Sequence, residues 1–134
     1  MRAFLALVAA VAMAQGGRTV WDGVYSADQA ARGKELYAKE CSSCHGTDLT
    51  GGESAPPLAG TEFLSNWTGQ SVGVLFDRTR QSMPANAPGK LTKAKTADVI
   101  AYLLAVNRFP EGKADMDTQA EALKQIQITE KPNR

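Results

Sequence analysis

Five consecutive residues, Cys41-Ser42-Ser43-Cys44-His45, hold both cysteines and the only histidine of this 134-residue chain. On a helical turn, residues three positions apart lie on one face, so Cys41 and Cys44 can each add a sulfur atom across a different vinyl group of one porphyrin. The imidazole of His45 then lies beneath the ring, where its nitrogen is a suitable iron ligand. The spacing therefore predicts one covalently attached haem c per chain.

Other uses of two cysteines and a histidine fit this spacing poorly. A tetrahedral zinc site needs four well-spread ligands, and the chain has no further Cys or His to complete one. A thioredoxin-like redox pair is typical of alternating strands and helices, and no such strands are predicted near the motif. A structural disulfide between Cys41 and Cys44 stays open as an alternative, although it gives His45 no role.

A second iron ligand is needed on the face opposite His45, and methionine, lysine, water or an open position are the choices. Met1 and Met13 lie in a predicted signal peptide, and Met116 lies in a polar tail. Met83 stands before a proline, between two predicted helical segments, on an irregular stretch that leaves its side chain free to point inward. We predict Met83 as the ligand, with filling of a hydrophobic core as its alternative role. A thioether favours ferrous iron, so this pair predicts a relatively high reduction potential.

A helix that begins at a capping box should lead into the cysteine motif. Ser26, followed three residues later by Gln29, is typical of a helix N-terminus. Small and apolar residues then repeat at steps of three and four, which predicts one packing face. Its members are Ala30, Gly33, Tyr37 and Cys41. Gly33 would let another helix approach closely, whereas a loose lead is expected over residues 15–25.

The stretch from residue 46 to residue 60 is rich in Gly and Pro, which predicts a loop that can cover one face of a haem. Pro57 fixes an extended backbone, and its carbonyl could accept a hydrogen bond from the free N–H of His45 and so orient the ring. A plain turn is the alternative role for this proline.

Three further helices are predicted after the loop. Residues 61–68 can form a short one, and Ser71 caps a second. The clearest amphipathic helix is expected to be capped by Thr96, to carry Asp98 in its first turn and to end before Pro110. In the helix that Ser71 caps, the residues of the helical repeat are Val72, Leu75, Phe76 and Thr79.

The first fourteen residues, with Arg2, an apolar run and an Ala-Met-Ala ending, predict a secretory signal peptide cleaved near Ala14. The apolar run is shorter than the roughly 20 residues that a membrane span needs, so no span is expected in the mature chain; a retained anchor is the alternative. Export also suits thioether formation, which requires reduced cysteines outside the bacterial cytoplasm. The chain is therefore expected to be periplasmic or secreted.

Charge excludes nucleic acid as a partner. Loss of Arg2 leaves as many basic as acidic side chains, and the basic ones are scattered along the chain rather than gathered in a stripe. The expected partners are redox proteins.

Four motifs, CSSCHG, PPLAG, SMP and DVIAYLLAVNRFPEG, occur in this order, and over residues 27–112 the chain resembles a small single-haem class I cytochrome c. It is similar in particular to bacterial members that work beside periplasmic quinoprotein dehydrogenases. The resemblance implies an all-α cytochrome c fold, with short helices packed around one covalently attached haem. A lead (15–26) and a tail (113–134) lie outside that core.

The resemblance also implies roles for individual residues. It makes Cys41 and Cys44 the thioether anchors, His45 and Met83 the axial ligands, and the Pro57 carbonyl the partner of His45. Trp67 stands where many relatives have a tryptophan that contacts a haem propionate, and simple packing is its alternative role. The helix with Gly33 is implied to cross the helix with Tyr102 at near right angles.

With both axial positions filled, electron transfer is favoured over catalysis at the iron. The chain is expected to be an electron carrier and not an enzyme, taking electrons from a dehydrogenase and passing them to an oxidase or another cytochrome. The alternative is a haem enzyme or gas sensor in which Met83 is displaced from the iron, and a non-haem interaction module is a third possibility. The tail can lie as a strap across the domain or dock a partner, through Leu123, Ile126 and Ile128.

Overall fold

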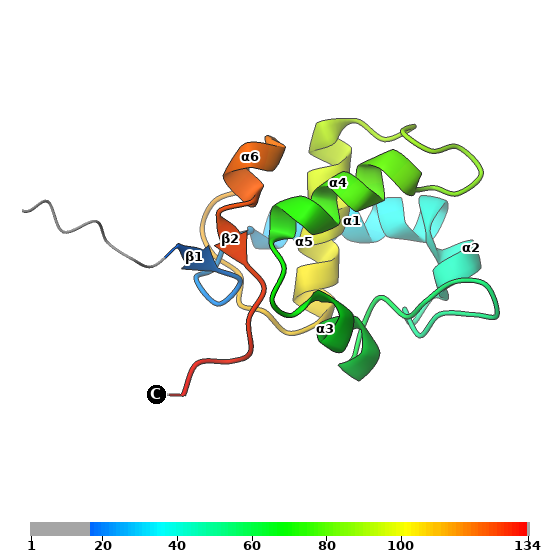
Figure 1. Ribbon diagram of the computed structural model, residues 1–134. Coiled ribbons are helices and arrows are strands. Elements are labelled where there is room, and N and C mark those ends of the chain that lie inside the picture. The colour runs from blue at the N-terminus through cyan, green and yellow to red at the C-terminus, as the bar shows by residue number, and fades with distance from the viewer. Residues whose placement is uncertain (1–16, 134) are drawn as a thin grey trace, which may run out of the picture.

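The computed structural model describes residues 17–133, and the predicted signal peptide (1–14) lies outside the described residues. The architecture is mostly helical, which confirms the predicted all-α class (Figure 1). The elements in chain order are β1 (Arg18–Thr19), α1 (Ala27–Glu40), α2 (Ser42–His45), α3 (Thr61–Trp67), α4 (Val72–Ser82), α5 (Lys93–Val106), α6 (Ala120–Leu123) and β2 (Ile126–Gln127).

Helix α1 begins where the sequence predicts. The Ser26 side chain accepts a hydrogen bond from the Gln29 backbone N–H at 3.1 Å, which satisfies one of the unpaired amides of the first turn. The Gln29 side chain does not complete the capping box. It is fully buried, and its Oε1 accepts from the backbone N–H of Met116 at 2.7 Å. The same residue therefore starts a helix and holds the C-terminal part of the chain.

Helix α1 crosses α5 at Gly33, as the predicted packing face requires (Figure 1). A Cβ atom on Gly33 would lie 1.8 Å from the backbone oxygen of Asp98 and 2.9 Å from the Cβ of Tyr102. Further along the crossing, the rings of Tyr37 and Tyr102 have their centroids 5.4 Å apart. Only a glycine allows this approach of the two helix backbones.

Gly33→Ala is expected to lower the free energy of unfolding by about 1–3 kcal/mol, because the added methyl group must force the two helices apart. Urea unfolding of the variant measures the loss. Lys34→Ala, at the exposed neighbouring position, is the control and should change the free energy by less than about 0.5 kcal/mol. Equal midpoints for Gly33→Ala and the unmodified chain would contradict this packing.

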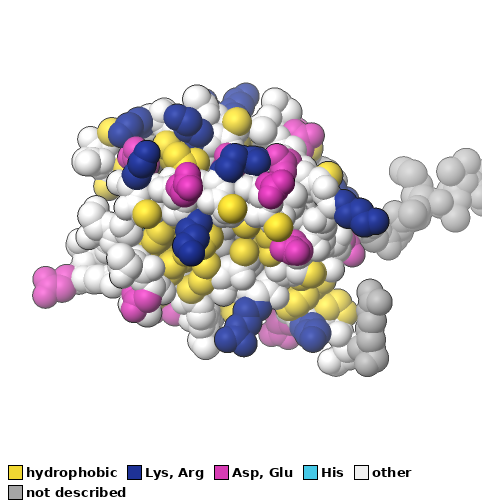
Figure 2. Space-filling view, turned by 180° about the vertical axis from the view of Figure 1, so that it is seen from behind, with side chains coloured by type: hydrophobic (Ala, Val, Ile, Leu, Met, Phe, Trp, Pro, Cys, Tyr) yellow, Lys and Arg dark blue, Asp and Glu magenta, His cyan; other side chains and the backbone are white. Residues whose placement is uncertain are grey.

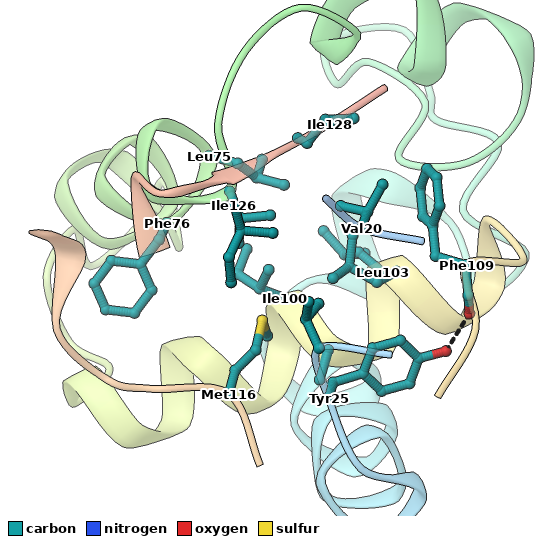
Figure 3. Close-up of a cluster of buried hydrophobic side chains, with 14 of the residues drawn as sticks. Val20, Tyr25, Leu75, Phe76, Ile100, Leu103, Phe109, Met116, Ile126 and Ile128 are labelled. Atoms are coloured by element: carbon teal, nitrogen blue, oxygen red, sulfur yellow. Dashed lines mark hydrogen bonds between the residues drawn. The ribbon is translucent and has the colours of Figure 1, made fainter. Parts of the chain in front are cut away.

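Helix α4 has its predicted cap, because the Ser71 side chain accepts from the backbone N–H of Val74 at 3.2 Å. Of its predicted repeat, Val72, Leu75 and Phe76 are buried. This face points into the core shown in Figure 3. The prediction for α4 is therefore confirmed.

The predicted start of α5 is wrong by one turn. The N-cap is Thr92, whose Oγ1 accepts from the backbone N–H of Lys95 at 3.2 Å. Thr96 is fully buried inside the helix, where its hydroxyl donates to the Thr92 carbonyl at 2.8 Å. Because the helix starts earlier, Asp98 lies beyond the first turn and pairs with Arg32 at 3.2 Å. Both threonines are good caps, and only the packing of α5 selects the first.

The expected loose lead is also wrong for residues 17–25. Strand β1 pairs with β2 in parallel, with Arg18 opposite Ile126, and the backbone N–H of Val20 donates to the Gln127 carbonyl at 3.0 Å. Val20 and Tyr25 are buried in the core (Figure 3). The lead is thus a structural part of the domain.

The C-terminal segment, residues 113–133, lies as a strap across the domain. Four of its apolar side chains are at most 4 % exposed, and α6 packs so closely on α4 that a Cβ on Gly73 would lie 2.5 Å from the backbone nitrogen of Lys124. The four side chains are Met116, Leu123, Ile126 and Ile128. Met116, Ile126 and Ile128 are labelled in Figure 3.

The surface agrees with the balanced charge of the sequence. Figure 2 shows Lys and Arg side chains interspersed with Asp and Glu on one face of the molecule, without a continuous basic stripe. Within residues 17–133, none of the helices has the length and apolar character needed to cross a membrane.

Candidate haem site

The cysteine motif lies on one helical turn, as its spacing predicts. Cys41 ends α1 and begins α2, and the backbone N–H of His45 donates to the Cys41 carbonyl at 3.0 Å. Both cysteines are free thiols; Cys41 is half-buried and Cys44 is exposed. Gly46, with a φ of 87°, turns the chain away after the histidine, a conformation that favours glycine. The two sulfurs and the imidazole thus come from a single short segment.

His45 is held by the loop that follows it. Its side chain is almost fully buried, and Nδ1 lies 2.8 Å from the Pro56 carbonyl oxygen. A carbonyl oxygen can only accept, so Nδ1 carries the proton and Nε2 keeps its lone pair. The ring is therefore oriented with its free nitrogen available to a metal.

The prediction that the Pro57 carbonyl is the partner of His45 is wrong by one residue, because the partner is the Pro56 carbonyl. The backbone N–H of Gly51 donates to the His45 carbonyl at 2.8 Å, and that of Gly52 donates to the Ala55 carbonyl at 2.9 Å. This tight closure brings the next carbonyl, that of Pro56, to the imidazole. Pro57 contributes from the following position, because a proline restricts the residue before it to an extended backbone.

Two side chains that the sequence analysis did not identify hold the ends of this loop. The Tyr37 hydroxyl donates to the Gly46 carbonyl at 2.6 Å. At the other end, Asn107 accepts from the backbone N–H of Gly60 and donates to the Leu58 carbonyl, each at 3.0 Å. The sequence predicts Tyr37 only as part of a packing face, and nothing in the sequence marks an asparagine after α5 as a loop anchor.

Met83 lies at the C-terminal end of α4, where its backbone N–H donates to the Thr79 carbonyl at 2.9 Å. Its side chain is half-buried. The segment that follows, residues 83–92, is tied to the end of α1 by an ion pair of 3.0 Å between Lys90 and Glu40. Because Glu40 precedes Cys41, this contact brings the Met83 segment to the same end of the molecule as the cysteine motif (Figure 1). Its ligand role stays a prediction.

Trp67, on α3, has a packing role in the structure. Its side chain is 9 % exposed, its ring lies 6.4 Å from that of Phe63, and the guanidinium of Arg78 stacks over it at 5.2 Å. Such a cation over an indole is favourable by about 0.5–1 kcal/mol at an exposed site. Contact with a haem propionate stays a prediction for this residue.

The electrostatics of the motif disfavour a thiolate. Burial, and then the charge of Glu40, raises the pKa of Cys41 to about 11. In the protein alone, this thiol therefore stays protonated at neutral pH. Within residues 17–133, no group of three or more His, Cys, Asp or Glu is placed to hold a metal ion. One imidazole with a fixed tautomer and two adjacent free thiols instead suit a haem.

Comparison with known proteins also supports a haem site. The family model described as cytochrome C oxidase, cbb3-type, subunit III, matches residues 28–103, which is more than half of the chain. The chain is 34% identical over 80 residues to the thiosulfate dehydrogenase of Stutzerimonas stutzeri (strain A1501), covering 54% of this chain and 26% of that protein. The crystal structure of the sulfane dehydrogenase SoxCD from Paracoccus pantotrophus is similar with a TM-score of 0.52 and 26% identity, covering 80% of this chain and 61% of that one. The chain thus spans only part of each of these relatives.

Proposed function

Because this chain belongs to the cytochrome c family described as cytochrome C oxidase, cbb3-type, subunit III, we propose that it carries single electrons on one covalently attached haem c. Membership confirms the cytochrome c fold and a function in haem-based electron transfer. The proposal adds the residues: thioether anchors at Cys41 and Cys44, and axial ligands at His45 and Met83. When bound, the haem supplies the couple between ferric and ferrous iron.

The observation that carries this proposal is the hydrogen bond from His45 Nδ1 to the Pro56 carbonyl, at 2.8 Å. It fixes the tautomer, so Nε2 is the ring nitrogen that can donate to iron. Since the loop carrying Pro56 is anchored at both ends, the imidazole needs little rearrangement when the iron changes charge. This rigidity favours fast electron transfer.

The two cysteines fix the cofactor to the same turn. Cys41 and Cys44 would hold the haem through thioether bonds, each made by addition of one S–H across one vinyl group, with the sulfur on one carbon and the hydrogen on its neighbour. Cys44 is exposed and Cys41 is half-buried, which places one sulfur at the surface of the domain and the other toward its interior. No atom is lost in the addition, so the chain gains the full mass of a haem.

Met83 would hold the iron from the face opposite His45. The ion pair between Lys90 and Glu40 supports this role, because it holds the Met83 segment against the end of α1. With His45 and Met83 both bound to the iron, no substrate would reach it, so the chain would act as a carrier and not as an enzyme. The competing function, a haem enzyme or gas sensor, requires Met83 to leave the iron.

The partners are redox proteins, in our proposal a dehydrogenase as donor and an oxidase or another cytochrome as acceptor. Two similar proteins support a dehydrogenase donor, since they are themselves named thiosulfate dehydrogenase and sulfane dehydrogenase. The proposed location is the periplasm or the exterior of the cell, after cleavage near Ala14.

Mass spectrometry of the chain produced in a host competent for cytochrome maturation tests the attachment. The expected mass is that of the chain from Gln15 plus one haem, and the denatured polypeptide should stay coloured. Replacing both Cys41 and Cys44 by alanine should remove the haem, whereas Ser43→Ala, between the two cysteines, should retain it. A colourless unmodified chain at apoprotein mass would refute covalent attachment.

A further inference from the structure

Arg80, on α4, has a buried side-chain nitrogen without a hydrogen-bond partner among the residues that the structure describes. Over residues 17–133, its Nε is the one buried side-chain nitrogen or oxygen without a hydrogen-bond partner. Buried donors are almost always paired in native proteins, and leaving one unpaired costs about 1–3 kcal/mol, more for a charged group. An arginine stays charged under all ordinary conditions. The position therefore calls for an acceptor, and an anion above all.

Within residues 17–133, no acidic side chain forms an ion pair with Arg80. The ion pairs among the described residues involve Arg32, Lys90 and Lys124, and none of them includes Arg80. The neighbouring Arg78 differs, because it is exposed and its guanidinium stacks over Trp67. Arg80 is thus a partly buried cation without a counter-ion in the described part of the chain.

The position of Arg80 connects it to the proposed haem site. It lies three residues before Met83, which places the two on one side of the helix end. Phe76, four residues before Arg80 on that side, is 1 % exposed, so this is the inward side of α4. In addition, a Cβ on Gly89 would lie 3.9 Å from the Arg80 carbonyl oxygen, so Arg80 also borders the Met83 segment.

We propose that the guanidinium of Arg80 binds a carboxylate group of the haem. This inference rests on the proposed function, since the haem brings the two propionates that the chain itself lacks here. A carboxylate accepts two parallel N–H bonds from one edge of a guanidinium, a geometry that uses Nε. The pair would neutralise the cation and fix the side of the haem that carries the propionates relative to α4.

The test compares haem-loaded Arg80→Gln and Arg80→Lys with the unmodified protein. We expect both variants to retain the haem and to shift the propionate bending band in the resonance Raman spectrum, because neither side chain can make the two-bond contact. Arg80→Gln should also lower the reduction potential, since an unpaired propionate stabilises ferric iron. Arg80→Lys keeps the charge, and it carries the test if the glutamine variant does not fold.

Arg18→Gln is the matched control, because it removes the same charge from an exposed position in β1 and should alter neither measurement. An unchanged propionate band in the Arg80 variants would overturn the inference. A lower reduction potential alone would not support it, because loss of a positive charge near the haem lowers the potential even without contact to a propionate. Failure of the unmodified chain to acquire haem would instead refute the proposed function. The two failures are therefore distinguishable.

Discussion

Replacing Met83 with alanine is expected to leave the haem attached, to lower the reduction potential by on the order of 100 mV and to allow carbon monoxide to bind. The thioether stabilises ferrous iron, and axial ligands as a group set haem potentials over a span of about 0.8 V. The methyl side chain of alanine offers no donor, so one face of the iron becomes accessible. Attachment is unaffected because it depends on Cys41 and Cys44.

The measurements for Met83→Ala are a potentiometric titration, the weak far-red sulfur-to-iron band of the ferric form, and the absorption change with carbon monoxide. Met116→Leu is the matched control. Met116 is the other methionine among the described residues and is buried in the core, so the volume-conserving change should cost less than about 1.5 kcal/mol and leave the spectrum intact. If the unmodified protein already binds carbon monoxide readily, the enzyme or sensor is favoured. An unchanged potential in Met83→Ala would reject Met83 as a ligand.

A chain that ends at Gly112 is expected to lose most of its stability, although it keeps the whole cysteine motif and Met83. The missing segment contributes four fully or almost fully buried apolar side chains. Each such side chain stabilises the fold by about 1.5–3 kcal/mol. Their sum, about 6–12 kcal/mol as an upper estimate, is comparable with the whole stability of a typical domain.

Thermal unfolding of the haem-loaded protein measures this loss. The control is a chain that ends after Thr129, because residues 130–133 are exposed while the Thr129 carbonyl accepts from the Trp21 indole at 2.9 Å. A single change, Ile128→Ala at a fully buried position, should cost about 2–5 kcal/mol. Equal melting temperatures for the two shortened chains would show that the C-terminal segment does not stabilise the domain.

Local patterns predicted the parts of this protein that depend on neighbouring residues. The cap at Ser26, the cap at Ser71 and the glycine at the helix crossing follow from spacing, and the chemistry of the cysteine motif follows from the types of its residues. The two caps and the glycine at the crossing are confirmed, because short-range hydrogen bonds and helical periodicity suffice to produce them. The chemistry of the cysteine motif stays a prediction. The ligand role of Met83 has the same kind of basis and awaits its test.

The predictions that failed depended on longer-range contacts or on a one-residue choice. Thr92 and Thr96 are both suitable caps, and the packing of α5 against α1 selects between them. Whether the carbonyl of Pro56 or of Pro57 meets the imidazole depends on how the loop closes at Ala55, and no residue type in the loop predicts that closure. The pairing of Arg18 with Ile126 joins positions more than a hundred residues apart, and neither short segment has a strand pattern of its own.

The parallel pairing of β1 with β2 also decides how this cytochrome can be built into larger assemblies. The polypeptide enters and leaves the domain side by side, at the end away from α2 (Figure 1). A neighbouring module fused at either terminus would therefore extend from that end and leave the surface near Cys44 uncovered. In the proposed function, the surface near Cys44 would then stay accessible to a redox partner.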